Sequence, residues 1–267
     1  MKIAVIYGSP RNGVTYEAVQ IVKKELQIQG DVQFTEFHLP QDMPNFCKGC
    51  FNCFQKGEAK CPDNRYIQPI LMAMSSADGF IISTPVYALQ ISGGLKAFFD
   101  HMAFCFLNHR PRFFRQKAFI VSTTAGAGTG SCNRYIKKNL SFWGIRKIYA
   151  IGGAMQAIDW NEVPTSIKYK TTRDLKRVAL RFGRDVKSGK VYAPSLLQTM
   201  MFYISRLIIS SYGHTIPDRE YWQQQGWLDK KLSYFYQPAK PSFINKAIAR
   251  VGVFVFRKMV LVKPGVG

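Results

Sequence analysis

Short apolar runs alternate with longer amphipathic stretches along the first 190 residues of the chain. An uninterrupted apolar run is typical of a strand buried on both faces, whereas apolar residues three and four apart indicate a helix. The pattern predicts strands over residues 2–7, 32–38, 79–83, 118–123 and 145–152. It predicts helices over residues 15–29, 68–75, 93–106, 131–143 and 171–187. This alternation favours an α/β fold, a doubly wound five-stranded parallel sheet with helices on both faces.

The pattern changes after Gly189, where prolines separate short apolar and aromatic runs. We therefore predict a domain over residues 1–190 and a C-terminal extension over residues 191–267. An aromatic stretch at residues 220–230 lies in this extension. The stretch is compatible with a lid, with a subunit contact or with packing against the main sheet. We expect the extension to be basic and largely helical.

The last part of the extension, residues 243–263, repeats apolar residues at helical spacing, with Lys246, Arg250 and Arg257 on another face. A helix with one apolar and one basic face is typical of a segment that lies on an anionic membrane surface. The alternatives are a terminal helix docked on the domain, a contact between subunits, and a strand over residues 251–256.

The chain of 267 residues is strongly basic, with a formal net charge of +21 at pH 7. Residues 1–165 carry 18 Lys and Arg against 11 Asp and Glu, whereas residues 166–267 carry 19 against 5, so the excess lies toward the C-terminus. Such charge attracts anions, including nucleotide phosphates and acidic lipid headgroups. The sequence shows no recognisable nucleic-acid-binding module, so nucleic acid is not an expected partner.

The apolar segments of the chain predict a cytoplasmic protein. The first of them, residues 3–7, is too short for the hydrophobic region of a signal peptide. The best candidate for a membrane span, residues 196–209, is interrupted by Arg206 and falls short of the roughly 18 apolar residues that a spanning helix needs. We therefore expect a cytoplasmic location that leaves room for peripheral contact with a membrane.

The loop between the first strand and the first helix, residues 8–15, has the chemistry of a phosphate site. A loop there directs backbone amides at a ligand, and the N-terminus of the following helix adds positive potential. Ser9 and Thr15 supply hydroxyls, and Arg11 supplies a guanidinium. Gly13 permits a tight turn. The spacing matches neither a Walker loop nor a Rossmann fingerprint, and an ordinary turn with a threonine cap explains the loop alone equally well.

Two further loops follow later strands and are expected at the same edge of the sheet, since ligands of parallel sheets bind at the carboxyl ends of the strands. In the first, Thr84 offers a hydroxyl, Pro85 stiffens the turn, and Tyr87 offers a flat aromatic wall. The second, residues 122–130, carries glycines at alternate positions that let the backbone bend around a ligand. Local packing explains each loop alone, but the three together favour a ligand site.

The three loops resemble those of the flavodoxin-like NAD(P)H-dependent FMN reductases. Gly8-Ser-Pro-Arg-x-Gly-x-Thr15 is similar to the loop that binds the FMN phosphate in that family, with Val14 where the family often has Asn. Residues 83–87 and 122–130 are similar to the stretches at the flavin ring. The resemblance implies a flavodoxin-like fold, FMN as cofactor and NAD(P)H as co-substrate. The cofactor-binding residues that it implies are Ser9, Arg11, Gly13, Val14, Thr15, Thr84, Pro85, Val86, Tyr87, Thr124, Ala125, Gly126 and Gly128.

Six cysteines occur in the chain, and four of them lie within fifteen residues: Cys47, Cys50, Cys53 and Cys61. In a reducing cytoplasm such a cluster more often signals metal or redox chemistry than disulfides. Short spacers can turn successive thiolates toward one iron–sulfur cluster. The spacing resembles the compact motif of the iron–sulfur flavoproteins, a branch of the same family, and so implies a 4Fe–4S cluster here. A metal-free, thiol-rich loop and a tetrahedral zinc site are the alternatives.

The predicted activity is that of a flavoprotein oxidoreductase, in which electrons pass from NAD(P)H through FMN to a small acceptor such as a quinone, a flavin or an iron–sulfur centre. No catalytic residue is assigned, because the flavin carries the chemistry. The rival hypothesis is an electron carrier or redox sensor of the same fold without NAD(P)H turnover. We expect a homodimer or homotetramer, and structural roles for Cys105, Cys132 and the four histidines.

Overall fold

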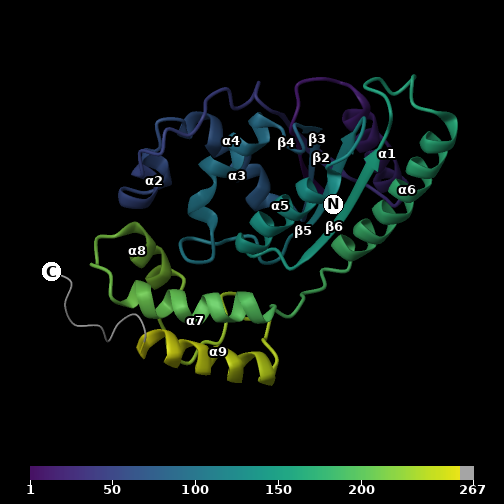
Figure 1. Cartoon of the computed structure of the whole chain (residues 1–267). Helices are drawn as coiled ribbons and strands as arrows, with labels where there is room; N and C mark the ends of the chain where they lie inside the picture. The colour runs from purple at the N-terminus through teal and green to yellow at the C-terminus, as the bar shows by residue number, and fades with distance from the viewer. Residues whose placement is uncertain (259–267) are drawn as a thin grey trace.

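The first part of the chain forms a parallel sheet (Figure 1). In a computed structural model of the chain, which describes residues 1–258, five parallel strands lie in the order β2-β1-β3-β5-β6. These strands are β1 (Lys2–Tyr7), β2 (Gln33–His38), β3 (Gly79–Tyr87), β5 (Lys117–Thr124) and β6 (Lys147–Ala154). A short strand that the sequence pattern does not predict, β4 (Gln90–Ile91), pairs with the end of β3 in an antiparallel hairpin. The order of the five parallel strands is the predicted flavodoxin-like one.

Helices cover both faces of this sheet, α1 and α6 on one face and α3, α4 and α5 on the other (Figure 1). The chain also forms two single 3₁₀ turns, Glu58–Lys60 between α2 and α3 and Ala103–Cys105 between α4 and β5. The helices are α1 (Val14–Ile28), α2 (Asn52–Gln55), α3 (Asn64–Ser76), α4 (Gly93–His101), α5 (Thr129–Phe142), α6 (Thr165–Lys187), α7 (Leu196–Ser210), α8 (Pro217–Gln224) and α9 (Phe243–Phe256).

Successive side chains of β1 enter two different cores. Ile3 and Val5 pack against α1 and α6, whereas Ala4 and Ile6 pack against the helices of the opposite face. All four side chains are at most 1% exposed. Burial on both faces explains why the strand is apolar along its length. Its pairing with β2 and β3 places the carboxyl end of β1 between those two strands at the edge where ligands bind.

Element boundaries differ from the predicted ones where the apolar pattern carries no signal. Helix α6 begins at Thr165 rather than at residue 171, because its first turn is polar and exposed. The strand predicted from residue 145 begins at Lys147, because the buried Ile145 belongs to the turn before it. The cysteine segment, predicted as a loop, contains the short helix α2 and a 3₁₀ turn.

The extension folds into a layer of its own, with α7, α8 and α9 below the sheet in Figure 1. Its core is aromatic, and the stretch predicted as a lid or contact contributes the buried Trp222 and Trp227 to it. Residues 251–256 are helical, so the strand alternative is wrong; residues 259–263 of the predicted amphipathic segment lie outside the described residues. Within residues 1–258, no helix combines the length and apolar character that a membrane crossing requires.

Candidate functional site

A cavity of about 220 Å³ opens at the carboxyl ends of the parallel strands. Loops after β1, β3, β5 and β6 line it, so the sheet topology brings together segments from most of the first 160 residues. The predicted residues that line this cavity are Ser9, Arg11, Gly13, Val14, Thr15, Pro85, Val86, Tyr87, Thr124 and Ala125.

One end of the cavity is the N-terminus of α1. The helix follows Gly13 directly, and among the described residues no side chain caps its first turn. Its first amides therefore remain available to an anion, with the helix dipole in support. Arg11 lies at the same end, and its own amide donates to Ser9 Oγ at 3.2 Å. The hydroxyls of Thr15 and Thr123 lie 2.6 Å apart and tie the helix to β5.

The base of the phosphate loop lies tight against β3. The Gly8 amide donates to the Ser83 carbonyl at 2.8 Å, and the Ser92 hydroxyl donates to the Gly8 carbonyl. A Cβ on Gly8 would lie 2.7 Å from that Ser83 oxygen, closer than van der Waals contact allows. Glycine is therefore required here for the loop to leave β1 in its present direction.

The other end of the cavity is an apolar and aromatic wall from the end of β3. Pro85, Val86 and Tyr87 line it, and Tyr87 remains 47% exposed. The turn that follows has two residues with positive φ, Ala88 at 48° and Leu89 at 64°. The backbone of a two-residue turn with positive φ angles has a twist that matches the twist of the two strands it joins. Residues other than glycine adopt these φ angles at a cost in free energy. The hairpin thus holds Tyr87 at the rim.

Three predicted ring residues lie outside the cavity lining. Thr84 is fully buried, and its hydroxyl donates to the Pro85 carbonyl at 2.8 Å and accepts from the Ser92 amide at 3.1 Å, so it braces the turn from behind. Gly126 is exposed at the tip of its loop. Gly128 lies against the β3–β4 hairpin, where a Cβ would meet Val86. Thr84 and Gly128 therefore support the wall of the cavity without forming it, whereas Gly126 neither lines the cavity nor packs against its wall.

Gly128→Ala is expected to weaken FMN binding, whereas Gly126→Ala is not. Gly128 has φ +107°, and an added Cβ would lie 2.8 Å from Val86 Cγ1, so the substitution strains the backbone by about 1–3 kcal/mol and displaces the wall. An added Cβ on Gly126 meets nothing within 4 Å. Titration of FMN fluorescence with each purified variant measures the difference. Equal affinities would contradict a supporting role for Gly128.

Thr123, Ala157 and Ile158 complete the lining. Thr123 lies in the predicted loop at residues 122–130 but was not among the named binding residues, and the other two lie outside the predicted loops. Thr123 directly precedes a predicted residue at the same strand end. Ala157 and Ile158 belong to the loop after β6, the last strand of the sheet. Ligands bind at the carboxyl ends of parallel strands, and the last predicted strand ends at the same edge of the sheet as the others. The position of the loop after that strand is therefore the signal that points to it.

All six cysteines lie in the described part of the chain and are free thiols. Cys47, Cys50, Cys53 and Cys61 line one small cavity of about 20 Å³, so the fold brings the four predicted ligands together. Burial and the neighbouring cysteines raise the pKa of the Cys53 thiol to about 11. Burial also raises the pKa of Cys61. Four sulfur donors around one cavity fit a metal cluster, which would hold them as thiolates.

His101 and Asp63 lie beside Cys61 in the same cavity lining. Cys61 Sγ is 4.0 Å from His101 Nδ1, and His101 Nε2 is 3.8 Å from Asp63 Oδ2. Asn45 fixes Asp63 by donating to its Oδ1 at 2.6 Å. No local pattern predicts this contact, because His101 lies on α4, forty residues beyond Cys61. Together the three side chains offer a mixed donor set next to the sulfur ligands.

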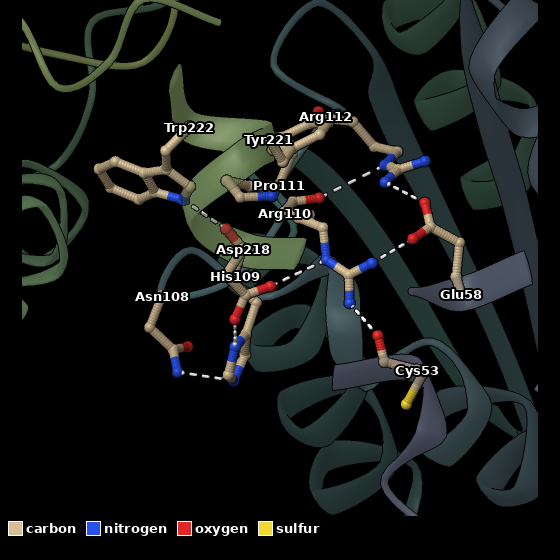
Figure 2. A network of polar contacts seen from close by, with 10 residues as sticks. All are labelled: Cys53, Glu58, Asn108, His109, Arg110, Pro111, Arg112, Asp218, Tyr221 and Trp222. Atoms are coloured by element: carbon tan, nitrogen blue, oxygen red, sulfur yellow. Dashed lines mark hydrogen bonds and ion pairs between the residues drawn. The ribbon is translucent and has the colours of Figure 1, made fainter. Parts of the chain in front are cut away.

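A buried arginine joins the cysteine loop to the extension (Figure 2). The Arg110 side chain is 2% exposed, and its Nε donates to Asp218 Oδ1 of α8 at 2.9 Å. Its other two nitrogens donate to the carboxylate of Glu58 and to the carbonyl of Cys53. The guanidinium thus uses all three of its nitrogens to join the cysteine loop to α8 of the extension.

Neighbouring groups complete this network. Arg112 donates to the second Glu58 oxygen at 2.9 Å, and His109 Nδ1 lies 2.7 Å from Asp218 Oδ2. Burial alone would raise the pKa of Glu58, but the charges of Arg110 and Arg112 hold it below its usual range. The Glu58 carboxylate is therefore ionised at neutral pH and anchors the turn between Cys53 and Cys61.

The family model described as NADPH-dependent FMN reductase matches residues 1–160, the part of the chain that forms the cavity. The chain belongs to this family. Membership identifies it as an FMN-dependent oxidoreductase of flavodoxin-like fold, as the three loops predict.

Two relatives resemble this FMN reductase over most of its length. An iron–sulfur flavoprotein of Archaeoglobus fulgidus is 25% identical over 232 residues, which cover 85% of this chain and 100% of the relative. An iron–sulfur flavoprotein of Clostridioides difficile is 29% identical over 238 residues, which cover 85% and 99%. The similarity places the chain in the iron–sulfur flavoprotein branch of the family.

Solved structures show the same fold. An FMN-dependent NADH-azoreductase of Bacillus anthracis, in complex with FMN, has a TM-score of 0.55 at 14% identity and covers 68% of this chain and 100% of its own. An oxidoreductase of Corynebacterium diphtheriae has a TM-score of 0.54 at 15% identity, covering 70% and 97%. At these identities the comparison supports the flavodoxin-like architecture of the FMN reductase and nothing finer.

Proposed function

We propose that this FMN reductase transfers electrons from NAD(P)H, through FMN in the cavity at the strand ends, to a small-molecule acceptor such as a quinone, a flavin or an iron–sulfur centre. The observation that carries the proposal is the composition of that cavity. An uncapped helix N-terminus with Arg11 lies at one end, and the wall with Tyr87 lies at the other. An amphipathic ligand with a phosphate and a flat ring system matches both ends.

Each part of the cavity would bind a different part of FMN. Ser9, Arg11 and Thr15 would hold the phosphate, together with the backbone of Gly13 and Val14. The ring would lie along Pro85, Val86, Tyr87, Thr124 and Ala125, with Thr84 and Gly128 in support. When bound, FMN would supply the hydride and electron transfer, and the residues of the cavity would orient it and exclude competing reactions.

The four cysteines would hold an iron–sulfur cluster, as the names of the two iron–sulfur flavoproteins suggest, and their compact spacing favours the 4Fe–4S type. The arrangement that supports this is the shared cavity of Cys47, Cys50, Cys53 and Cys61. A cluster supplies one-electron transfer. The chain's part is to fix the loop through Glu58 and Arg110 and to supply positive charge with Lys48 near the sulfurs.

The wider setting of the protein is also part of the proposal. We place it in the cytoplasm as a homodimer or homotetramer, with residues 1–190 as the flavin domain and residues 191–267 as an extension. A non-enzymatic electron carrier of the same fold is the rival function. It would bind FMN in the same cavity, so only the reaction with nicotinamide separates the two.

Anaerobic stopped-flow mixing of the FMN-loaded protein with NADPH tests the activity. We expect the flavin absorbance to bleach within seconds, because an enzyme of this family must admit the nicotinamide next to the ring. The same experiment with NADH shows which donor is preferred. A flavin that stays oxidised with both donors, yet is reduced by dithionite, would leave the electron carrier as the function.

A further inference from the structure

Helix α9 is attached to the rest of the protein by a narrow strip of residues along one side. The helix packs along α7, and of its residues, all of which the structure describes, only Ala249 is buried. Gly252 lies on the same side, where an added Cβ would be 3.1 Å from Met200 Cε. Val253 packs against the aromatic core of the extension. Docking through this strip leaves the larger side chains of α9 free to face outward.

The outward side of α9 is apolar. Its exposed apolar residues recur three and four positions apart, so they share one face of the helix. Each of them is between 44% and 85% exposed. Figure 1 shows α9 as the outermost element of the extension, on the far side of α7 from the sheet. The residues of this apolar face are Phe243, Ile244, Ile248, Val251, Phe254 and Val255.

A basic stripe borders the apolar face. Lys246, Arg250 and Arg257 are four and seven positions apart, which places them together along one edge of the helix. Helix α9 carries no acidic residue. Residues 191–258 as a whole contain nine Lys and Arg against three Asp and Glu, and one of the acids, Asp218, is buried in the network of Figure 2. The surface around α9 is therefore strongly positive.

A contiguous apolar face of this kind marks an interaction surface, because proteins rarely leave one open to water. A second copy of the chain would bring two basic stripes face to face, with no carboxylates on α9 to offset them. An anionic lipid surface offers both an apolar layer for the apolar face and negative headgroups for the stripe. We propose that α9 lies flat on an anionic membrane and docks the protein there. The charge of the extension selects this occupant over self-association.

Co-sedimentation with lipid vesicles tests the proposal on the full, FMN-loaded protein. Vesicles of phosphatidylcholine mixed with phosphatidylglycerol supply the anionic surface, and pure phosphatidylcholine supplies the neutral one. One variant, Ile244→Ser/Ile248→Ser/Val251→Ser, removes the apolar face. A second variant, Lys246→Gln/Arg250→Gln/Arg257→Gln, removes the stripe. The control Ile28→Ser/Met72→Ser changes two exposed apolar residues outside the extension.

We expect the parent protein and the control to sediment with anionic vesicles and to remain in solution with neutral ones. Each α9 variant should bind at least about tenfold more weakly, and rising salt should release the parent protein. FMN fluorescence and a thermal melt confirm that each variant is folded. No binding to anionic vesicles at low salt, or unchanged binding by both α9 variants, would overturn the proposal. A parent dimer that the apolar variant makes monomeric, without any vesicle binding, would assign the face to a second copy instead.

Discussion

Arg110→Met is expected to lower the free energy of unfolding by about 3–5 kcal/mol, the cost of leaving buried charges without their partner. The guanidinium contacts Asp218, whose side chain is 4% exposed, and Glu58, which is 25% exposed. Methionine fills a similar volume but donates no hydrogen bond, so the Cys53 carbonyl also loses its partner. Urea denaturation of the FMN-free protein, followed by tryptophan fluorescence, measures the loss.

Two further variants distinguish the loss of the Arg110 contacts from a general loss of packing. Arg112→Met removes a half-buried contact to the same Glu58 and should cost less, about 1 kcal/mol. Adding Asp218→Leu to Arg110→Met should recover part of the stability, because it removes the stranded carboxylate. If Arg110→Met costs no more than Arg112→Met, the network of Figure 2 does not link the extension to the cysteine loop energetically.

The same network makes the stability of the folded protein depend on pH in the acid range. Because Arg110 and Arg112 hold the pKa of Glu58 below its usual range, this carboxylate contributes stability above its unfolded pKa. That contribution is lost as the pH falls through the lowered pKa of the folded state. Arg110→Met should weaken this acid dependence, since one of the two charges that lower the pKa is gone.

Local patterns in the sequence were sufficient to predict the sheet and most of the residues that line the cavity at the strand ends. A strand buried on both faces, such as β1, is apolar at every position, and the order of strands and helices determines which loops meet at the sheet edge. That is why Arg11, Tyr87 and Thr124 could be placed in one site without coordinates. The sequence pattern does not indicate in which direction a side chain points at the end of a strand. Thr84 was predicted at the flavin ring, but its side chain lies behind the cavity wall.

Contacts between distant segments could not be predicted in this way. Arg110 and Asp218 are 108 residues apart, and neither stands out among the many charged residues of the chain. His101 meets Cys61 only because α4 packs beside the cysteine loop. The periodicity of α9 predicted a helix with two faces, but the pattern does not say which side would dock. The structure shows that the side with Ala249, Gly252 and Val253 docks, whereas the side with most of the apolar residues stays exposed.

Cys53→Ala is expected to abolish binding of an iron–sulfur cluster while FMN stays bound. After anaerobic reconstitution with iron and sulfide, the iron content per chain should fall on the order of tenfold or more. Loss of a residue that only hydrogen-bonds to a metal ligand already lowers metal affinity by about tenfold, and loss of the ligand itself should lower it further. The Arg110 contact uses the Cys53 carbonyl and survives the change. Iron analysis and the visible spectrum measure the cluster, and flavin release on heating measures FMN.

Cys132→Ala is the matched control, because that thiol is fully buried in the main core and lies outside the cysteine cavity. It should retain both iron and FMN. If the parent protein takes up zinc but no iron, the four thiols form a tetrahedral zinc site; if it takes up neither, they form a metal-free loop. If Cys53→Ala loses FMN together with iron, the two cavities are coupled, and the loop that Arg110 anchors also shapes the flavin site. Retention of FMN without iron would show that the sheet edge binds the flavin by itself and that the cysteine loop serves only the onward transfer of electrons.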